Sequence, residues 1–175
     1  MRIRKASATA VCLVLLATAP LLAGCSADTA VAGTRPTATT HRAPVGLGSA
    51  EQVAAYMEQD ISSMSTSVVY TAATDPDHLL GRSGGYRSKA AFTDSRIQPG
   101  EVAGTGASPV DLGGVIETYA TAGQARARAA HLQATLSGLD AAEYHYYAGA
   151  SLIRVSRILT PVQAADYQQA AEALG

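Results

Sequence analysis

Tryptophan and asparagine are absent from this chain, and cysteine occurs only twice, at Cys12 and Cys25. Without asparagine the chain has no acceptor for N-glycosylation and no Asn-Gly hairpin turn. Cys12 lies in an N-terminal apolar stretch that we expect to be removed, so the mature chain would retain one cysteine. A single cysteine excludes intramolecular disulfides and cysteine metal clusters, and we expect no thiolate catalysis.

Basic residues are also scarce after residue 24, where the chain has ten Lys and Arg against fourteen Asp and Glu. The formal charge of that part is therefore −4. A protein that binds nucleic acid needs a basic surface to neutralise phosphates. The charge balance argues against nucleic acid as the partner.

The N-terminus has the three parts of an export signal. Arg2, Arg4 and Lys5 precede an apolar run from about Ala8 to Leu22, and Leu-Ala-Gly-Cys follows at residues 22–25. The apolar run is shorter than the roughly 20 residues of a spanning helix, and small residues follow it as at a cleavage site. We predict a signal peptide over residues 1–24.

The cysteine directly after Leu-Ala-Gly resembles the lipobox of bacterial lipoproteins, which implies that Cys25 is lipidated and becomes the mature N-terminus. Two or more acyl chains anchor a protein stably, because each buried CH₂ contributes about 0.8 kcal/mol. The expected location is the extracytoplasmic face of the cell membrane. The alternative is an unmodified cysteine at an ordinary signal-peptidase site.

Composition divides the mature chain into two parts. Residues 25–48 are rich in Thr, Ala, Gly and Pro and show no apolar periodicity, so they are predicted to be a disordered spacer. Residues 49–175 are predicted to form a single α+β domain.

Capping patterns and apolar spacing predict the elements of that domain. Helices are expected to begin after Ser49, Thr121 and Thr160, each followed three residues later by Gln. Segments rich in Val, Ile and Tyr predict strands at 68–72, 85–93, 114–120, 143–148 and 152–158, with a hairpin turn at Gly149-Ala150 and a loop over 94–113. The order α-β-β-β-α-β-β-α favours a largely antiparallel sheet with helices packed on one face.

The least generic stretch is Asp-Pro-Asp-His-Leu-Leu-Gly-Arg-Ser-Gly-Gly-Tyr-Arg-Ser-Lys, at residues 75–89. It resembles a motif, DPxHLLGRxGGYxSK, of small actinobacterial lipoproteins of unknown function. The later Gly-Gly-x-Ile-Glu and Tyr-His-Tyr segments extend the resemblance over roughly residues 49–174. This chain departs from the pattern at Asp77 and Ser83, where the family has Asn and Pro. The resemblance implies a family hallmark and assigns no activity.

The motif combines glycines with basic side chains, which favours an anionic ligand or a protein partner. The residues predicted to form this site are Arg82, Gly84, Gly85, Tyr86, Arg87 and Lys89. The alternative is a structured loop whose glycines serve turns and whose arginines pair with Asp75 or Asp77. The spacing is not that of a P-loop.

Three other sites are possible, two of them in the same motif. A hydrolase would be centred on His78 and Asp75, although no spacing ties them to a nucleophile. Asp75, Asp77 and His78 contain ligand types for a divalent metal, but too few to predict a metal site. The tyrosines of 144–147 suit a partner surface or simple sheet packing.

Taken together, these features predict a membrane-anchored binding or interaction module of the cell envelope, without a cofactor. The rivals are an envelope hydrolase and a purely structural envelope protein.

Overall fold

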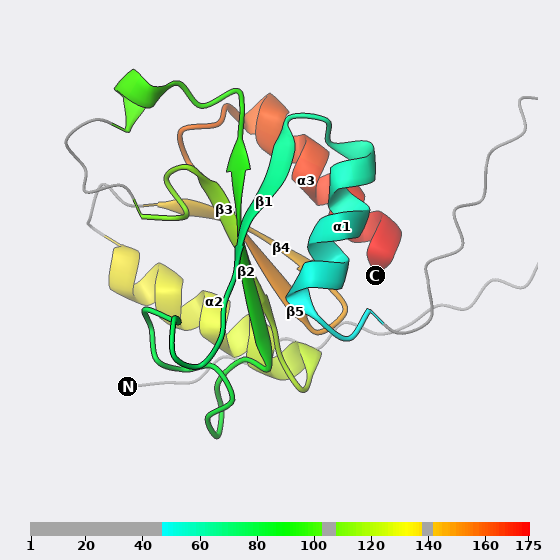
Figure 1. Ribbon diagram of the computed structural model, residues 1–175, viewed down its shortest axis with the longest axis vertical. Helices are drawn as coiled ribbons and strands as arrows, with labels where there is room; N and C mark the ends of the chain where they lie inside the picture. The colour runs from blue at the N-terminus through cyan, green and yellow to red at the C-terminus, as the bar shows by residue number, and fades with distance from the viewer. Residues whose placement is uncertain (1–46, 103–107, 138–141) are drawn as a thin grey trace, which may run out of the picture. The chain divides into compact units, whose positions relative to one another are not determined.

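The computed structural model describes residues 47–102, 108–137 and 142–175, which form three α-helices, a short 3₁₀ helix and five strands (Figure 1). The elements are α1 (Ala50–Asp60), β1 (Met64–Val69), β2 (Ser88–Asp94), η1 (Pro99–Glu101), β3 (Gly113–Thr118), α2 (Ala122–Leu136), β4 (Glu143–Ala148), β5 (Ser151–Ser156) and α3 (Pro161–Leu174). The predicted class and the order α-β-β-β-α-β-β-α are confirmed.

The five strands form one sheet in the order β1-β2-β3-β5-β4, and every neighbouring pair is antiparallel. The predicted hairpin joins β4 to β5 through Gly149, whose φ of 56° favours glycine. Strand β1 carries a register shift between Thr66 and Val68, whereas β4 pairs with β5 without interruption. The two edges of the sheet therefore differ in regularity.

All three helices begin where the capping patterns predict. The side chains of Ser49, Thr121 and Thr160 each accept a hydrogen bond from the backbone N–H of the Gln three residues later. At Thr121 and Thr160 the glutamine side chain also accepts from the cap backbone, which completes the capping box. These starts depend on local contacts alone, which explains why sequence predicts them well.

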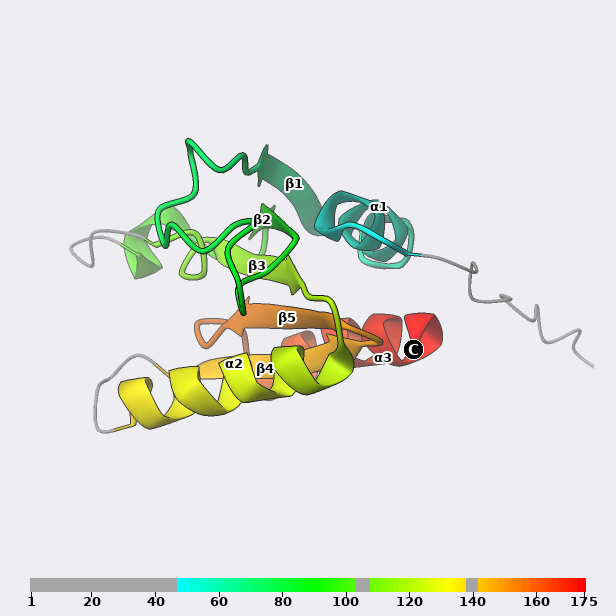
Figure 2. The same cartoon turned by 90° about the horizontal axis from the view of Figure 1, so that it is seen from below.

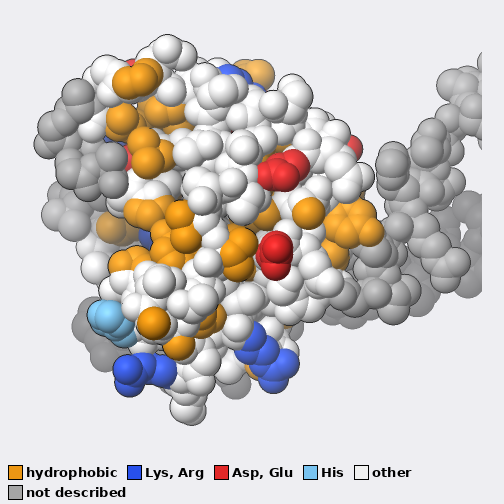
Figure 3. Space-filling model, in the orientation of Figure 1, with side chains coloured by type: hydrophobic (Ala, Val, Ile, Leu, Met, Phe, Trp, Pro, Cys, Tyr) orange, Lys and Arg blue, Asp and Glu red, His pale blue; other side chains and the backbone are white. Residues whose placement is uncertain are grey.

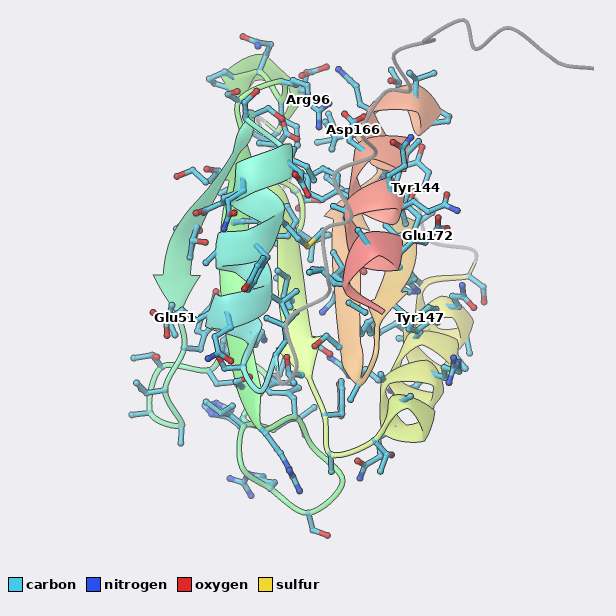
Figure 4. The ribbon with its side chains drawn as sticks, turned by 90° about the vertical axis from the view of Figure 1, so that its right-hand side faces the viewer. Glu51, Arg96, Tyr144, Tyr147, Asp166 and Glu172 are labelled. Atoms are coloured by element: carbon cyan, nitrogen blue, oxygen red, sulfur yellow. The ribbon has the colours of Figure 1, made fainter. Side chains whose placement is uncertain are left out.

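Helices α1 and α3 cover one face of the sheet and enclose the main hydrophobic core (Figure 4). Val53 and Met57 of α1 pack with Tyr167 of α3 against Phe92 and Ile153 of the sheet. The Phe92 and Tyr167 rings stack with centroids 5.2 Å apart. This face is almost wholly apolar, as expected where two helices bury a sheet.

Helix α2 lies on the opposite face, which corrects the prediction that the helices share one face (Figure 2). Its residues Ala125, Ala129 and Leu132 pack on Leu152, whose chain neighbour Ile153 belongs to the α1–α3 core. Successive side chains of a strand point to opposite faces, so the two helix layers must be separate.

Several element boundaries also differ from the prediction. Helix α1 ends at Asp60, and β1 begins at Met64, four residues before the predicted start of the first strand at residue 68. Strand β1 ends at Val69, whereas the predicted strand continued to Ala72. The predicted loop over 94–113 contains η1.

The signal peptide, the lipidation of Cys25 and the predicted spacer up to residue 46 lie outside the described residues. Within the described ranges no helix is long and apolar enough to cross a membrane.

Candidate functional site

The face of the sheet beneath α2 carries a row of charged side chains. Four neighbouring strands contribute one each: Lys89 from β2, Glu117 from β3, Arg154 from β5 and Glu143 from β4. Lys89 lies directly opposite Glu117, and Arg154 lies opposite His145 of β4. Charged residues in apolar strands are tolerated only when they are paired, and here each one is.

The first part of this row joins the motif loop to the sheet. The Lys89 ammonium contacts Asp75 at 3.0 Å and Asp77 at 2.7 Å, and it donates to the Tyr86 hydroxyl at 3.2 Å. The Tyr86 hydroxyl donates to Asp75 at 2.6 Å. Side-chain exposure is 3% for Lys89 and 0% for Asp75. A buried pair of this kind is costly to break from one side.

Asp75 also organises the backbone that follows it. Its carboxylate accepts the N–H groups of Leu79 at 2.8 Å and Leu80 at 3.0 Å. Burial opposes ionisation of Asp75, but the hydrogen bonds from Tyr86, Lys89 and these N–H groups together hold its pKa well below the usual range. Asp75 is therefore ionised near neutral pH, and its carboxylate anchors the loop.

The second part of the row extends across β3 and β5. Glu117 accepts hydrogen bonds from Tyr119 at 2.7 Å, Arg154 at 3.0 Å and Arg128 of α2 at 3.3 Å. Arg128 also reaches Asp77, at 3.4 Å, which links α2 to the motif loop. The two parts thus form one continuous network.

The row ends at the edge strand β4. Arg154 donates two hydrogen bonds to Glu143, at 2.8 and 2.7 Å, and Glu143 lies 3.2 Å from Nε2 of His145. Burial opposes ionisation of Glu143, but these two neighbours lower its pKa to about 2. The other ring nitrogen of His145, Nδ1, is buried and has no hydrogen-bond partner among the described residues.

Five of the six predicted ligand residues fall into two groups, and the sixth, Gly85, is half-buried. Arg82, Gly84 and Arg87 are exposed, as a binding role requires. Tyr86 and Lys89 are instead buried inside the network, so they are not available on the surface. Both were predicted at the surface because their partners, Asp75 and Asp77, are brought to them only by the fold.

The glycines of the motif serve the shape of the loop. Gly84 has a φ of 79°, a conformation that other residues adopt at a cost. Gly85 packs closely against the backbone of Leu79, since an added Cβ would lie 2.0 Å from the Leu79 carbonyl oxygen. These two positions fit the alternative in which the glycines serve turns.

The rival hydrolase was centred on His78 and Asp75. His78 is exposed, and within the described residues no hydrogen bond or ion pair joins its side chain to Asp75. Its contact with Asp75 runs through the backbone, from the His78 N–H to the Asp75 carbonyl at 3.2 Å. No group of three His, Cys, Asp or Glu side chains in the described ranges is arranged to hold a metal ion.

Sequence reasoning did not identify Glu117, Arg128, Arg154 or Glu143 as members of a site. The available signal was a single charge within an otherwise apolar strand, as in Val-Ile-Glu at 115–117 and Leu-Ile-Arg at 152–154. Such a charge requires a partner of opposite sign.

Comparisons of the chain with protein-family models, with curated proteins and with solved structures found no match.

Proposed function

We propose that this protein is a lipid-anchored module of the cell envelope that binds phosphate esters through the loop between β1 and β2. The anchor is Cys25, as the lipobox-like sequence indicates. The observation that supports the binding role is a pair of exposed arginines, Arg82 and Arg87, on a loop held rigidly by a buried ion-pair network.

Backbone hydrogen bonds fix the chain beside both arginines. The N–H of Gly81 donates to the carbonyl of Tyr86 at 2.9 Å, and the arginines follow these two residues in the chain. The Arg87 N–H donates to the carbonyl of Thr118, which attaches that end to β3. Both side chains therefore extend from backbone that is held by hydrogen bonds.

The charge of these arginines is not neutralised within the protein. Every described ion pair involves other cations, namely Lys89, Arg96, Arg128, Arg154 and His145. Basic side chains lie at the lower end of the face shown in Figure 3, where the loop lies. A guanidinium presents a planar set of donors that matches a phosphate group. Preorganisation reduces the entropy lost on binding.

Titration of the full chain with glycerol 3-phosphate tests this proposal. The double variant Arg82→Ala/Arg87→Ala should weaken binding at least ten-fold, and Arg82→Lys/Arg87→Lys should weaken it less because charge is retained without the planar donors. The matched control Arg126→Ala/Arg157→Ala removes two exposed charges elsewhere and should bind as the unchanged protein does. Tyr86 is left intact because it is buried.

Vesicles of phosphatidylcholine with and without phosphatidylglycerol distinguish a lipid headgroup from a soluble ester. Stronger binding to phosphatidylglycerol vesicles that depends on the two arginines would identify the headgroup as the source. Equal phosphate affinity in the double variant and the control would contradict the proposal.

A further inference from the structure

Strand β4 is an edge strand of the described sheet, and it has no bulge, proline or lysine. An edge strand presents unpaired N–H and C=O groups, which proteins usually shield with bulges, prolines or lysines. The opposite edge, β1, has its irregularity between Thr66 and Val68. All six residues of β4, Glu-Tyr-His-Tyr-Tyr-Ala, instead pair regularly with β5 and include no proline or lysine. The β4 edge is suited to accept another strand.

Two cavities flank this edge, and a different helix lines each of them. A cavity of about 370 Å³ is lined by His145, Tyr146 and Tyr147 of β4 and by Gln168, Ala171 and Glu172 of α3. A cavity of about 240 Å³ is lined by Glu143 and His145, by Ala142 and by Gln133, Leu136 and Ser137 at the end of α2. The two helices cover opposite faces of the sheet.

The placement of the cavities matches the geometry of an extended peptide. Side chains of a strand alternate between the two faces of a sheet. A peptide paired with β4 would therefore direct successive side chains toward α3 and toward α2. In strand addition the backbone bonds supply affinity, while pockets for alternate side chains supply specificity.

His145 lines both cavities and has a ring nitrogen without a partner. Its side chain is 4% exposed, and Nδ1 is the one buried side-chain nitrogen or oxygen without a hydrogen bond in the described ranges. Buried polar groups are nearly always satisfied, so an exception in a saturated network calls for an explanation. A polar group of an incoming strand would supply the missing partner.

The side chains at the cavities also define the chemistry of the occupant. Glu172 of α3 is exposed and accepts a hydrogen bond from Gln168 at 2.8 Å, and no described cation pairs with it. Figure 4 shows Glu172 and Tyr144 on the α3 side, well apart from Glu51 on α1. A basic side chain would complement this carboxylate. On the α2 side, half-buried Leu136 favours an apolar side chain.

We infer that the β4 edge binds an extended segment of a partner protein as a sixth strand. The segment directs a Lys or Arg side chain toward Glu172 and the next side chain, an apolar one, toward Leu136. This surface shares no residue with the Arg82–Arg87 loop, so it adds a second binding site to the proposed function and does not depend on it.

Hydrogen exchange of the full chain tests the inference with a defined peptide, acetyl-Val-Lys-Val-Lys-Val-amide. Strand addition should slow amide exchange in residues 143–148. The same peptide with every amide N-methylated cannot pair as a strand and should have no effect. A peptide with Glu in place of Lys should bind more weakly, because it faces Glu172.

Two exposed glutamates, Glu172 on α3 and Glu51 on α1, provide a test variant and its control. Glu172→Gln should weaken binding of the lysine peptide about two- to five-fold, as expected for loss of one exposed ion pair. Glu51→Gln removes a carboxylate from α1 and should leave binding unchanged.

Three outcomes would overturn the inference. One is no slowing in β4 at millimolar lysine peptide, and another is equal slowing by the N-methylated or the glutamate peptide. The third is slowing that rises with protein concentration in the absence of peptide, together with a doubled mass, which would identify a second copy of the chain as the occupant.

Discussion

Replacing Lys89 by methionine should destabilise the fold by about 3–5 kcal/mol at pH 7, which is the usual cost of breaking a buried ion pair from one side. The Lys89 side chain is 3% exposed, and its ammonium contacts Asp75 at 3.0 Å and Asp77 at 2.7 Å. Methionine fills a similar volume, so the lost stability comes mainly from the charge left on Asp75. Asp77 is less buried and can be solvated instead. A loss of this size is a large part of the total stability of a small domain.

Urea unfolding followed by circular dichroism measures this loss. Arg82→Met is the matched control, because Arg82 is an exposed cation on the same loop and its replacement should change stability by no more than about 0.5 kcal/mol. The double variant Asp75→Asn/Lys89→Met should recover stability relative to Lys89→Met, since the unpaired charge is gone.

The pH dependence provides a second test of the same reasoning. In the unchanged protein the pKa of Asp75 is lowered, so its contribution to stability is complete above the unfolded pKa, about 3.9, and is lost as the pH falls further. Loss of Lys89 should raise that pKa, so the deficit of the variant should shrink as the pH falls from 7 toward 4. A deficit under about 1 kcal/mol at pH 7, or one that is independent of pH, would refute the assigned role of Lys89.

Two further changes test the loop and the far end of the network. Gly85→Ala should lower the free energy of unfolding, measured in urea, by about 2–4 kcal/mol, because the new Cβ would lie 2.0 Å from the Leu79 carbonyl oxygen. Gly100→Ala serves as the control, since a Cβ there has nothing within 4 Å. Similar costs for the two variants would contradict the close packing of Gly85 against Leu79. Glu143→Gln should lower the free energy of unfolding at pH 7. The difference in unfolding free energy between this variant and the unchanged protein should narrow between about pH 5 and pH 3, because the pKa of Glu143 rises from about 2 in the folded state to its ordinary value, about 4.3, on unfolding. The same difference at pH 7 and pH 3 would show that the Glu143 carboxylate contributes no stability.

The sequence by itself determined the elements and their order. Helix starts at Ser49, Thr121 and Thr160 and the turn at Gly149 depend on contacts between residues close in the chain, so a linear pattern contains them. The antiparallel sheet followed from strand patterns with a hairpin between the last two helices. The exposed part of the motif, Arg82 and its neighbours, was also recognised from composition.

Only the tertiary structure decided which face each helix covers and which motif residues are buried. Ala125 and Ala129 on α2 do not reveal which face of the sheet they will contact, because small apolar side chains fit either one. The contact between Arg128 and Asp77 spans 51 positions in the chain, so no local pattern encodes it. A charged side chain is stable in the interior only when the fold supplies a partner, and for that reason the buried state of Lys89 became evident only once Asp75 and Asp77 were placed beside it.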